Sequence, residues 1–415
     1  MSCCACMPAV RAASLAVLAL LGACAPSQPP RATGAAPGIA PVAATRALPL
    51  NEAVAQLATA MVKNAQLPPA GPDGRYPIVI DPWIDRATGQ QVATTRLMAS
   101  EIQALAPANF PMLELLPFTP ASLERRPLVL LGAIAAVSGP GQVQTVGTRP
   151  GAYRIYGALA DLQSGRIVSQ ESAWVRPEAV DMTPTVAFRD SPAWSTEPTR
   201  SAYLRAATAV PGQGVDADYL AGLPASALAV QGGQEYEAGR FPQALALYQQ
   251  AAALPGGRQL RVLNGLYLAN QAMDRTPQAE AAFGQLVGFG LSQGRLAVKF
   301  LFAPGSAAFW PDPAISGAYP MWLRQVAAAT EQSGQCLRLV GHASPSGSPA
   351  ANQRLSAQRA RRVASLLARD NPELRGRLRA EGVGARSSII GTGADNATDV
   401  LDRRVEFEPY ACPRA

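Results

Sequence analysis

The stretch of residues 341–367, GHASPSGSPAANQRLSAQRARRVASLL, constrains the fold of this chain more than any other. The second half of this stretch has the 3.6-residue period of an amphipathic helix. At 100° per residue, one stripe about 140° wide collects eight residues. They are Asn352, Leu355, Ser356, Arg359, Ala360, Val363, Leu366 and Leu367. The opposite face is rich in arginine and glutamine, so we predict a helix that packs one face against a core.

Two polar residues, Asn352 and Arg359, lie in the middle of the stripe that faces the core. A guanidinium turned inward requires an anionic partner, because an unpaired buried charge costs several kcal/mol. That partner is either an anionic group of a ligand or an internal carboxylate, for which Asp402 and Glu406 are available. The residues alone leave both explanations open.

The spacing Asn-x-x-Leu-Ser-x-x-Arg-Ala-x-x-Val-x-x-x-Leu in this helix resembles the signature of OmpA-family C-terminal domains. Gly341-His342 before the helix and the run Asp402-Arg403-Arg404-Val405-Glu406 near the end of the chain match the same pattern. The resemblance covers about residues 296–412. It implies a C-terminal domain over 293–415, an α/β sandwich with a mixed sheet, that holds the diaminopimelate of bacterial peptidoglycan non-covalently.

The resemblance also implies which residues contact peptidoglycan, namely Ser344, Asn352, Arg359 and Arg404. In the family, an inward arginine and a nearby aspartate grip the carboxylates and the amine of the ligand, and Arg359 falls on the arginine position. Ser344 stands where the family has the aspartate, and this departure removes the negative half of the grip. An acidic residue of the loop 391–399, Asp395 or Asp399, is a candidate replacement. The alternative is that residues 391–399 form an ordinary surface loop without a role in the pocket.

The N-terminal sequence indicates export and lipid anchoring. Arg11 precedes an apolar run over 12–21, which is too short to span a bilayer as a mature helix. The run ends in Leu-Gly-Ala-Cys24, which resembles a bacterial lipobox and implies a signal peptide over 1–23 and acylation of Cys24. An ordinary secretory signal is the alternative. Residues 24–48 are rich in Pro, Ala and Gly, so we expect a linker there.

Cys336 and Cys412 are the two cysteines expected to remain available for a disulfide in the exported chain. The three cysteines before residue 7 leave with the signal, and Cys24 is acylated. Export places the remaining pair in an oxidising compartment. Cys336 opens the strand that leads to Gly341, and Cys412 closes the strand that begins near Arg404. If these strands are antiparallel neighbours, the sulfurs meet at one end of the sheet, and we predict a disulfide.

Residues 49–185 have the pattern of one α/β domain. Helical periodicity alternates with short apolar segments typical of strands, and a Gly-containing turn predicts a hairpin. We expect helices over 50–67 and 94–105 and strands over 76–81, 112–117, 127–137, 153–162 and 166–175. This order, with the segment ALADLQSGRIVSQ, resembles envelope domains of the TolB-amino-terminal, LpoB and CsgG kind, which implies binding to protein partners. Asp81, Asp85 and Asp161 are candidates for a metal or acid site, but aspartates beside strand ends are more typical of turns.

Residues 186–220 contain Pro192 and Pro198 and are expected to be a second linker. Residues 221–292 carry a repeat with an offset of 35 residues, since Ala279 follows Ala244 and Phe283 follows Tyr248. The period and the small residues resemble tetratricopeptide motifs and imply two helical hairpins. Such arrays bind a peptide or protein in a groove, and a helical spacer is the alternative.

The C-terminal domain is expected to contain one further helix and four strands. The helix covers 318–332, and the strands cover 296–302, 336–340, 378–383 and 405–408. The last strand alternates apolar and charged residues, which predicts one buried face and one exposed face.

Composition and missing motifs exclude several classes of function. The net charge of +7 comes nearly all from arginine, without a basic tract interleaved with aromatic residues, so nucleic acid is not an expected partner. His342 is the one histidine, no cluster of metal ligands is present in the sequence, and no Gly-rich phosphate loop follows a strand. We therefore expect neither an enzyme nor a bound cofactor or metal.

These features predict a multidomain chain of an α/β domain, a short tetratricopeptide-like helical region and an OmpA-like domain. The first functional hypothesis is a lipoprotein of the outer membrane that faces the periplasm. It is anchored to membrane lipid through Cys24, and it tethers the membrane to peptidoglycan. The second is an envelope assembly adaptor that binds protein partners and whose OmpA-like domain has lost wall binding. Ser344 favours the second hypothesis.

Overall fold

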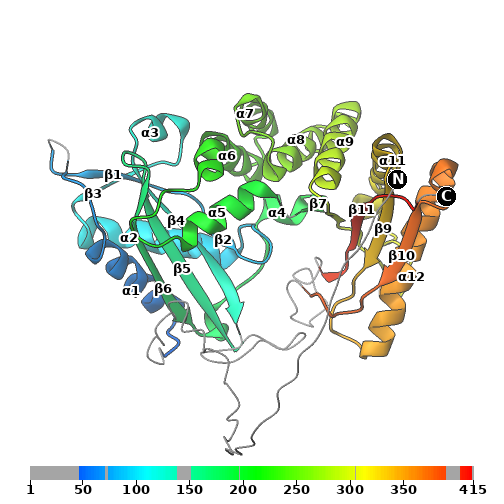
Figure 1. Ribbon diagram of the computed structural model, residues 1–415, viewed down its shortest axis with the longest axis horizontal. Helices are drawn as coiled ribbons and strands as arrows, with labels where there is room; N and C mark the ends of the chain where they lie inside the picture. The colour runs from blue at the N-terminus through cyan, green and yellow to red at the C-terminus, as the bar shows by residue number, and fades with distance from the viewer. Residues whose placement is uncertain are drawn as a thin grey trace, which may run out of the picture. The chain divides into compact units, whose positions relative to one another are not determined.

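The structure is a computed structural model that describes residues 46–70, 73–137, 151–195, 197–303, 305–388 and 402–413 (Figure 1). The expected signal peptide, Cys24, nearly all of the linker 24–48 and the loop 391–399 lie outside these residues. Within the described ranges, no helix combines the length and the apolar character needed to cross a membrane.

The first sheet contains the five expected strands and one short additional strand. Its members are β1 (Tyr76–Ile80), β2 (Ile84–Asp85), β3 (Leu113–Leu116), β4 (Leu128–Val137), β5 (Ala152–Asp161) and β6 (Arg166–Val175). The strand order is β3-β1-β4-β5-β6, and β2 pairs with β4. Strand β1 runs parallel to both neighbours, whereas β4, β5 and β6 form an antiparallel meander.

Helices cover both faces of this sheet. One face packs against α1 (Leu50–Lys63) and α2 (Ala93–Asn109), whose apolar residues share a core with β1, β4, β5 and β6. The other face packs against α5 (Pro198–Thr208) and the first half of α6 (Ala217–Glu237). Short elements complete this part of the chain: α3 (Pro120–Glu124) and η1 (Pro177–Ala179). The central strands are therefore buried on both sides, which explains their nearly continuous apolar runs.

Residues 186–220, expected to be a linker, are instead a folded part of the structure. They form α4 (Val186–Asp190), strand β7 (Ala193–Trp194) and helix α5. Pro198 lies in the first turn of α5, where a missing N–H costs no hydrogen bond. Tyr203 of α5 is buried and donates from Oη to the carbonyl of Gly132 at 2.9 Å. The prolines that suggested a linker therefore begin helices or lie between elements.

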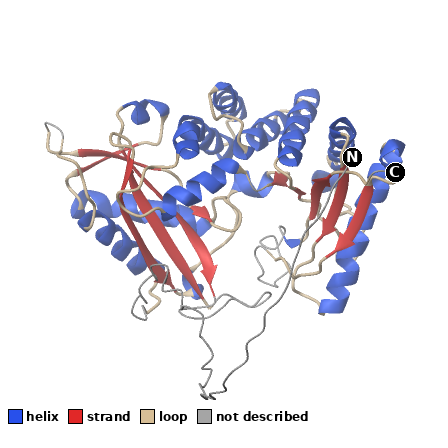
Figure 2. Cartoon of the chain, viewed as in Figure 1, coloured by secondary structure: helices blue, strands red, loops and turns tan. Residues whose placement is uncertain are grey.

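Four helices follow as two consecutive hairpins: α6, α7 (Phe241–Ala253), α8 (Leu260–Ala272) and α9 (Thr276–Ser292). No strand interrupts this run of helices, as Figure 2 shows. The offset of 35 residues appears in the backbone, because Gly239 (φ 73°) and Asp274 (φ 54°) both adopt left-handed conformations at the turn inside each hairpin. Helix α6 begins at Ala217, earlier than expected, because the side chain of Asp216 caps it.

The second sheet is mixed, with the order β10-β9-β11-β8-β7. Its C-terminal strands are β8 (Leu296–Val298), β9 (Cys336–Gly341), β10 (Leu378–Gly382) and β11 (Val405–Tyr410). Helices α10 (Pro313–Ser316), α11 (Tyr319–Ser333), α12 (Pro349–Asp370) and η2 (Pro372–Leu374) complete this domain. Strand β7 comes from the segment expected to be a linker and pairs antiparallel with β8. The C-terminal sheet is thus completed by residues about a hundred positions upstream.

Two strand expectations in this domain differ from the structure. Strand β8 ends at Val298 rather than at 302, because the next residues leave the ladder and Phe302 pairs with Phe309 in an isolated bridge. Strand β11 was expected to expose its charged face, but Glu406 is 1% exposed. Strand β11 lies between β9 and β8, so both of its edges are paired, and the Glu406 side chain is buried among Arg295, His342 and Arg404.

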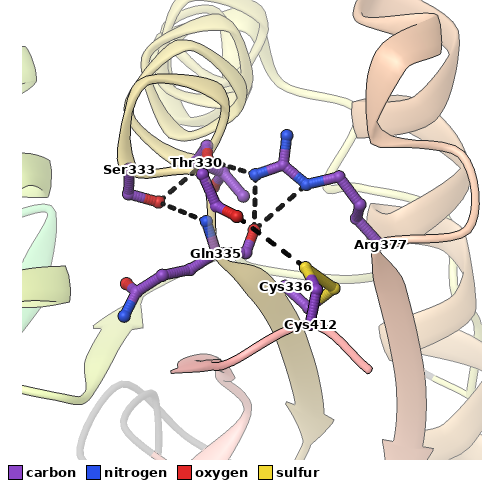
Figure 3. The surroundings of a disulfide bond; sticks show 7 residues. Thr330, Ser333, Gln335, Cys336, Arg377 and Cys412 are labelled. Atoms are coloured by element: carbon purple, nitrogen blue, oxygen red, sulfur yellow. Dashed lines mark hydrogen bonds between the residues drawn. A yellow bond between two sulfur atoms is a disulfide. The ribbon is translucent and has the colours of Figure 1, made fainter. Parts of the chain in front are cut away.

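The predicted disulfide between Cys336 and Cys412 is present, with 4.9 Å between the Cα atoms (Figure 3). The strands that lead to it are antiparallel neighbours, as expected, and Tyr410 is opposite Cys336. Arg377 lies beside the bond and donates to the carbonyl oxygens of Thr330 (2.7 Å) and Gln335 (3.1 Å). The start of β9, the end of α11 and the start of β10 are therefore joined at one place.

The helical hairpins and the C-terminal domain share one hydrophobic core. Phe283 of α9 stacks on Trp322 of α11 with ring centroids 5.5 Å apart. The indole Nε1 of Trp322 donates to the hydroxyl of Tyr267 in α8 at 3.0 Å. Leu296, Phe300 and Phe407 belong to the same buried cluster. These two regions are therefore packed together as a single hydrophobic unit.

Lys299 joins the segment 186–190 to the C-terminal sheet. It is 8% exposed, and its Nζ donates to the carbonyls of Phe188 (2.7 Å) and Arg189 (3.2 Å). Burial lowers the pKa of Lys299 to about 7, although the negative charge of Asp190 acts to raise it. The folded protein thus releases a proton from Lys299 near neutral pH, whereas an unfolded lysine keeps it up to about 10.5.

We expect stability to rise with pH through this group. Above the folded pKa the unfolded state binds more protons, so the free energy of unfolding increases. The free energy of unfolding of the natural chain, minus that of Lys299→Met, should increase by roughly 2 kcal/mol between pH 7 and pH 9. Urea unfolding at both pH values measures it. Replacement of the exposed Lys63, the other lysine of the chain, serves as the control. Parallel pH profiles for the natural chain and Lys299→Met would contradict this assignment.

Candidate functional site

A cavity of about 360 Å³ lies beside the first turns of α12 and the loop that follows β9. Its described lining residues are Gly305, Ala343, Ser344, Ser346, Gly347, Ala351, Asn352, Arg354, Leu355, Gln358, Arg359 and Arg403. Helix α12 begins at Pro349, and the Ser348 hydroxyl caps it by accepting from the N–H of Ala351 at 3.2 Å. Three of the four residues predicted to contact peptidoglycan, Ser344, Asn352 and Arg359, are therefore brought together in one cavity.

Close contact between α12 and the strands sets the position of these side chains. A Cβ atom at Gly341 would lie 2.0 Å from the carbonyl oxygen of Ser356, and one at Gly382 would lie 2.2 Å from the amide nitrogen of Ala357. The Ser356 hydroxyl accepts from the N–H of Gly384 at 2.9 Å. Glycine at the ends of β9 and β10 thus allows the helix to approach the sheet and turns Asn352 and Arg359 toward the cavity.

Arg359 is 3% exposed and has internal contacts as well as a place in the cavity lining. Its Nε donates to the carbonyl of Ser306 at 3.2 Å. Its guanidinium lies 4.9 Å from the centroid of the Phe302 ring, within the range of a cation–π interaction. Asn352, 6% exposed, donates from Nδ2 to the carbonyl of Gly347 at 3.2 Å. Six of the eight residues on the predicted inward stripe are therefore buried as expected, and Leu355 and Leu366 are half-buried.

Arg404, the fourth predicted residue, is buried away from the described cavity lining. It is 1% exposed, and its Nε lies 2.6 Å from Oε1 of Glu406. Arg295 also pairs with Glu406, and His342 Nε2 lies 3.5 Å from the same carboxylate. Arg403, the preceding residue, is among the described residues that line the cavity.

The carboxylate of Glu406 holds this buried group of charges together. Burial by itself raises the pKa of Glu406, but the contact with His342 and the positive charge of Arg404 outweigh it and lower the pKa to about 2. Burial also lowers the pKa of His342, which favours the neutral imidazole. Glu406 was one of the two carboxylates considered as internal partners of Arg359. It is instead engaged by Arg404, Arg295 and His342.

Ser344 supplies a neutral hydroxyl at the position where the family has an aspartate. It is 4% exposed, and its Oγ lies 3.4 Å from Oγ of Ser346. The described lining contains three arginines and no acidic side chain. Asp395 and Asp399, the candidate replacements for the aspartate, lie outside the described residues. The described part of the cavity therefore favours an anionic ligand group.

The aspartates considered for a metal or acid site have different surroundings. Asp85 and Asp161 accept hydrogen bonds from residues two and three positions later, as in Asx turns. Asp81 is buried and accepts from the hydroxyl of Tyr219 at 2.8 Å. No group of three potential metal ligands among His, Cys, Asp and Glu occurs in the part of the chain that the structure describes.

No protein-family model matches the chain, and no curated protein sequence matches it. Several solved structures are similar to part of it. The cell wall anchor of the T6SS from Pseudomonas aeruginosa is 27% identical, with 28% of this chain and 80% of that chain covered and a TM-score of 0.24. An outer membrane protein from Borrelia burgdorferi B31 is 19% identical, with 28% and 86% covered and a TM-score of 0.22. The OmpA-like domain of FopA1 from Francisella tularensis is 18% identical, with 28% and 75% covered and a TM-score of 0.22.

Proposed function

We propose that this chain is an outer-membrane lipoprotein that tethers the membrane to peptidoglycan. Acylated Cys24 would anchor it, and the domain over 293–415 would hold the wall non-covalently. The observation that carries this proposal is the cavity beside α12, where Arg359 and Asn352 project from the buried stripe of the helix. An arginine guanidinium suits a carboxylate because its planar fork donates two parallel hydrogen bonds. The carboxylates of diaminopimelate in peptidoglycan are such groups.

A tether of this kind needs only moderate affinity for each site. Confinement to the membrane raises the effective concentration of the wall around the domain, and many copies act together. The α/β domain and the helical hairpins would bind protein partners in the same envelope. Three of the similar solved structures are described as a cell wall anchor, an outer membrane protein and an OmpA-like domain.

Sedimentation with isolated peptidoglycan sacculi tests the proposal. The protein used is the chain from residue 24 with Cys24→Ala, so that no acyl chain contributes to binding. We expect Arg359→Gln to weaken binding at least about tenfold, because it removes a charged hydrogen bond to the ligand. Arg361→Gln is the matched control, since Arg361 is exposed on the same helix and outside the cavity lining. Equal binding by both variants would contradict the role of Arg359.

The serine at position 344 offers a second variant that adds rather than removes an interaction. Ser344→Asp restores a carboxylate at the family position and should tighten binding to sacculi if the amine of the ligand lies there. A gain in Ser344→Asp would support the site even if Arg359→Gln proved unstable.

The second candidate function is an envelope assembly adaptor that binds protein partners without binding the wall. The neutral hydroxyl of Ser344, where the family has an aspartate, is the observation that favours it. If neither the natural chain nor Ser344→Asp sediments with sacculi, the tether proposal is wrong and the adaptor is preferred.

A further inference from the structure

A second cavity, of about 760 Å³, lies where the α/β domain meets the helical hairpins. Its floor includes Ile80 and Pro82 at the carboxyl end of β1 and Leu116 and Phe118 at the carboxyl end of β3. Helices α6 and α8 form another wall. Strand β3 lies on one side of β1, and β4, which follows β3 in the chain, lies on the other side of β1. The strand order therefore reverses at β1. Ligands of open α/β sheets bind at the carboxyl ends of strands at such a reversal.

Arg261 of α8 adds a positive charge to the lining without a hydrogen bond or ion pair at contact distance among the described residues. The other charged lining residues, Arg96 and Glu237, pair with each other at 2.6 Å. Arg261 forms no hydrogen bond within 3.5 Å and no ion pair within 4.0 Å with any residue that the structure describes. Its charge acts from a greater distance on Asp81, whose Oδ2 accepts from the Tyr219 hydroxyl (2.8 Å) and whose Oδ1 has no hydrogen-bond partner in the described structure. It also acts on Glu197, which accepts from the Leu260 N–H (2.6 Å). The donors of Arg261 are therefore available to a ligand.

Asn264 lies one helical turn after Arg261 and presents an unpaired acceptor. It is 3% exposed, lines the cavity, and donates from Nδ2 to the carbonyl of Ala193 at 3.2 Å. This bond orients the amide, and Oδ1 is left buried without a hydrogen-bond partner. Buried acceptors are almost always satisfied in native proteins, so Oδ1 is a place where an N–H or O–H donor, from water or from a ligand, can bind. Residues three apart on a helix share a face, so Arg261 and Asn264 can contact one ligand together.

The rest of the lining suits an uncharged, partly apolar body. Glutamines line it at five positions, Gln90, Gln91, Gln103, Gln231 and Gln234. Ile84, Leu116, Phe118 and Leu268 add apolar surface. The volume is within the usual range for small-molecule sites, about 300–1,000 Å³. We propose that this cavity binds a small organic anion whose carboxylate or phosphate pairs with Arg261 and whose N–H or O–H group donates to Asn264 Oδ1.

The fluorescent probe 8-anilinonaphthalene-1-sulfonate tests this site, because it combines an anionic group, an N–H donor and an apolar body. Titration of the full chain with Cys24→Ala should give a saturable fluorescence increase with one probe per chain. We expect Arg261→Gln to weaken this binding at least about tenfold, since a charged hydrogen bond is lost. Arg258→Gln is the control, because Arg258 is exposed near the start of the same helix and outside the lining. Asn264→Leu, which removes the acceptor, should also weaken it.

Competition then distinguishes the two kinds of anion. Displacement of the probe by N-acetylglycine would identify a carboxylate ligand, and displacement by glycerol 3-phosphate would identify a phosphate ligand. Non-saturable binding, equal binding by Arg261→Gln and the natural chain, or displacement by neither compound would overturn the proposal. Sacculus sedimentation of Arg261→Gln should match the natural chain, so this site is tested independently of wall binding.

Discussion

Replacement of Cys336 and Cys412 by alanine is expected to lower the free energy of unfolding by about 4.5 kcal/mol. The disulfide closes a segment with a sequence separation of 76 residues. In the chain-entropy description, cross-linking a segment of that length lowers the conformational entropy of the unfolded chain, which raises the free energy of the unfolded state by about 4.5 kcal/mol. The bond also ties the start of β9 to the end of the chain just after β11, two neighbouring strands of the second sheet. Urea unfolding of the oxidised natural chain and the double variant measures the difference.

Reduction of the natural chain provides the control for this prediction. Dithiothreitol should bring the midpoint of the natural chain to that of the double alanine variant and should not change the variant. If the two oxidised proteins unfold at the same urea concentration, the disulfide does not constrain the unfolded state as argued. A single alanine variant is unsuitable, because it leaves a free thiol that can form bonds between chains.

Trp322→Ala is expected to lower the free energy of unfolding by about 3–5 kcal/mol, the usual cost of truncating a large buried aromatic residue. Trp322 is 7% exposed and stacks on Phe283 with an interplanar angle of 17°. Its loss also leaves the Tyr267 hydroxyl without the indole N–H at 3.0 Å. Because these partners belong to α8 and α9, we expect the substitution to loosen the helical hairpins and the C-terminal domain together. Differential scanning calorimetry measures both the loss and its distribution.

Trp174→Ala is the matched control, since Trp174 lies half-buried on β6 of the other sheet. It should cost much less and should leave the C-terminal transition in place. A Trp322→Ala protein whose hairpins melt at the natural temperature would show that the shared core does not couple the two regions.

Apolar pattern was sufficient to predict the elements that are buried by many neighbours. The strands of the first sheet occur where apolar runs end at Gly, Pro or Asp, and α12 buries six of the eight residues placed on its inner stripe. The prediction failed where a few tertiary contacts decide the structure. A strand of two residues, Ala193–Trp194, has no periodicity to detect, and it forms because β8 offers a free edge.

The candidate site was predictable to the extent that its residues lie on one helix. Asn352 and Arg359 share a stripe of α12, and their spacing alone places them together. Arg403 and Phe302 reach the same place from distant parts of the chain, which the local pattern does not reveal. Arg404 is buried against Glu406 outside the described lining, and the local pattern did not indicate this buried ion pair. The cavity around Arg261 depends on the contact of two domains and left no signal in the sequence.

The pairing of β7 with β8 determines how this protein can be divided. A fusion that begins at residue 293 would transfer the wall-binding candidate site without the strand at 193–194 that completes its sheet. It would also leave behind the carbonyls of Phe188 and Arg189 that accept from Lys299, and the aromatic residues of α8 and α9 that cover Trp322. Residues 293–415 are thus not a complete folding unit by themselves. A transferable unit has to start before α4, so that it includes the hairpins and the upstream strand.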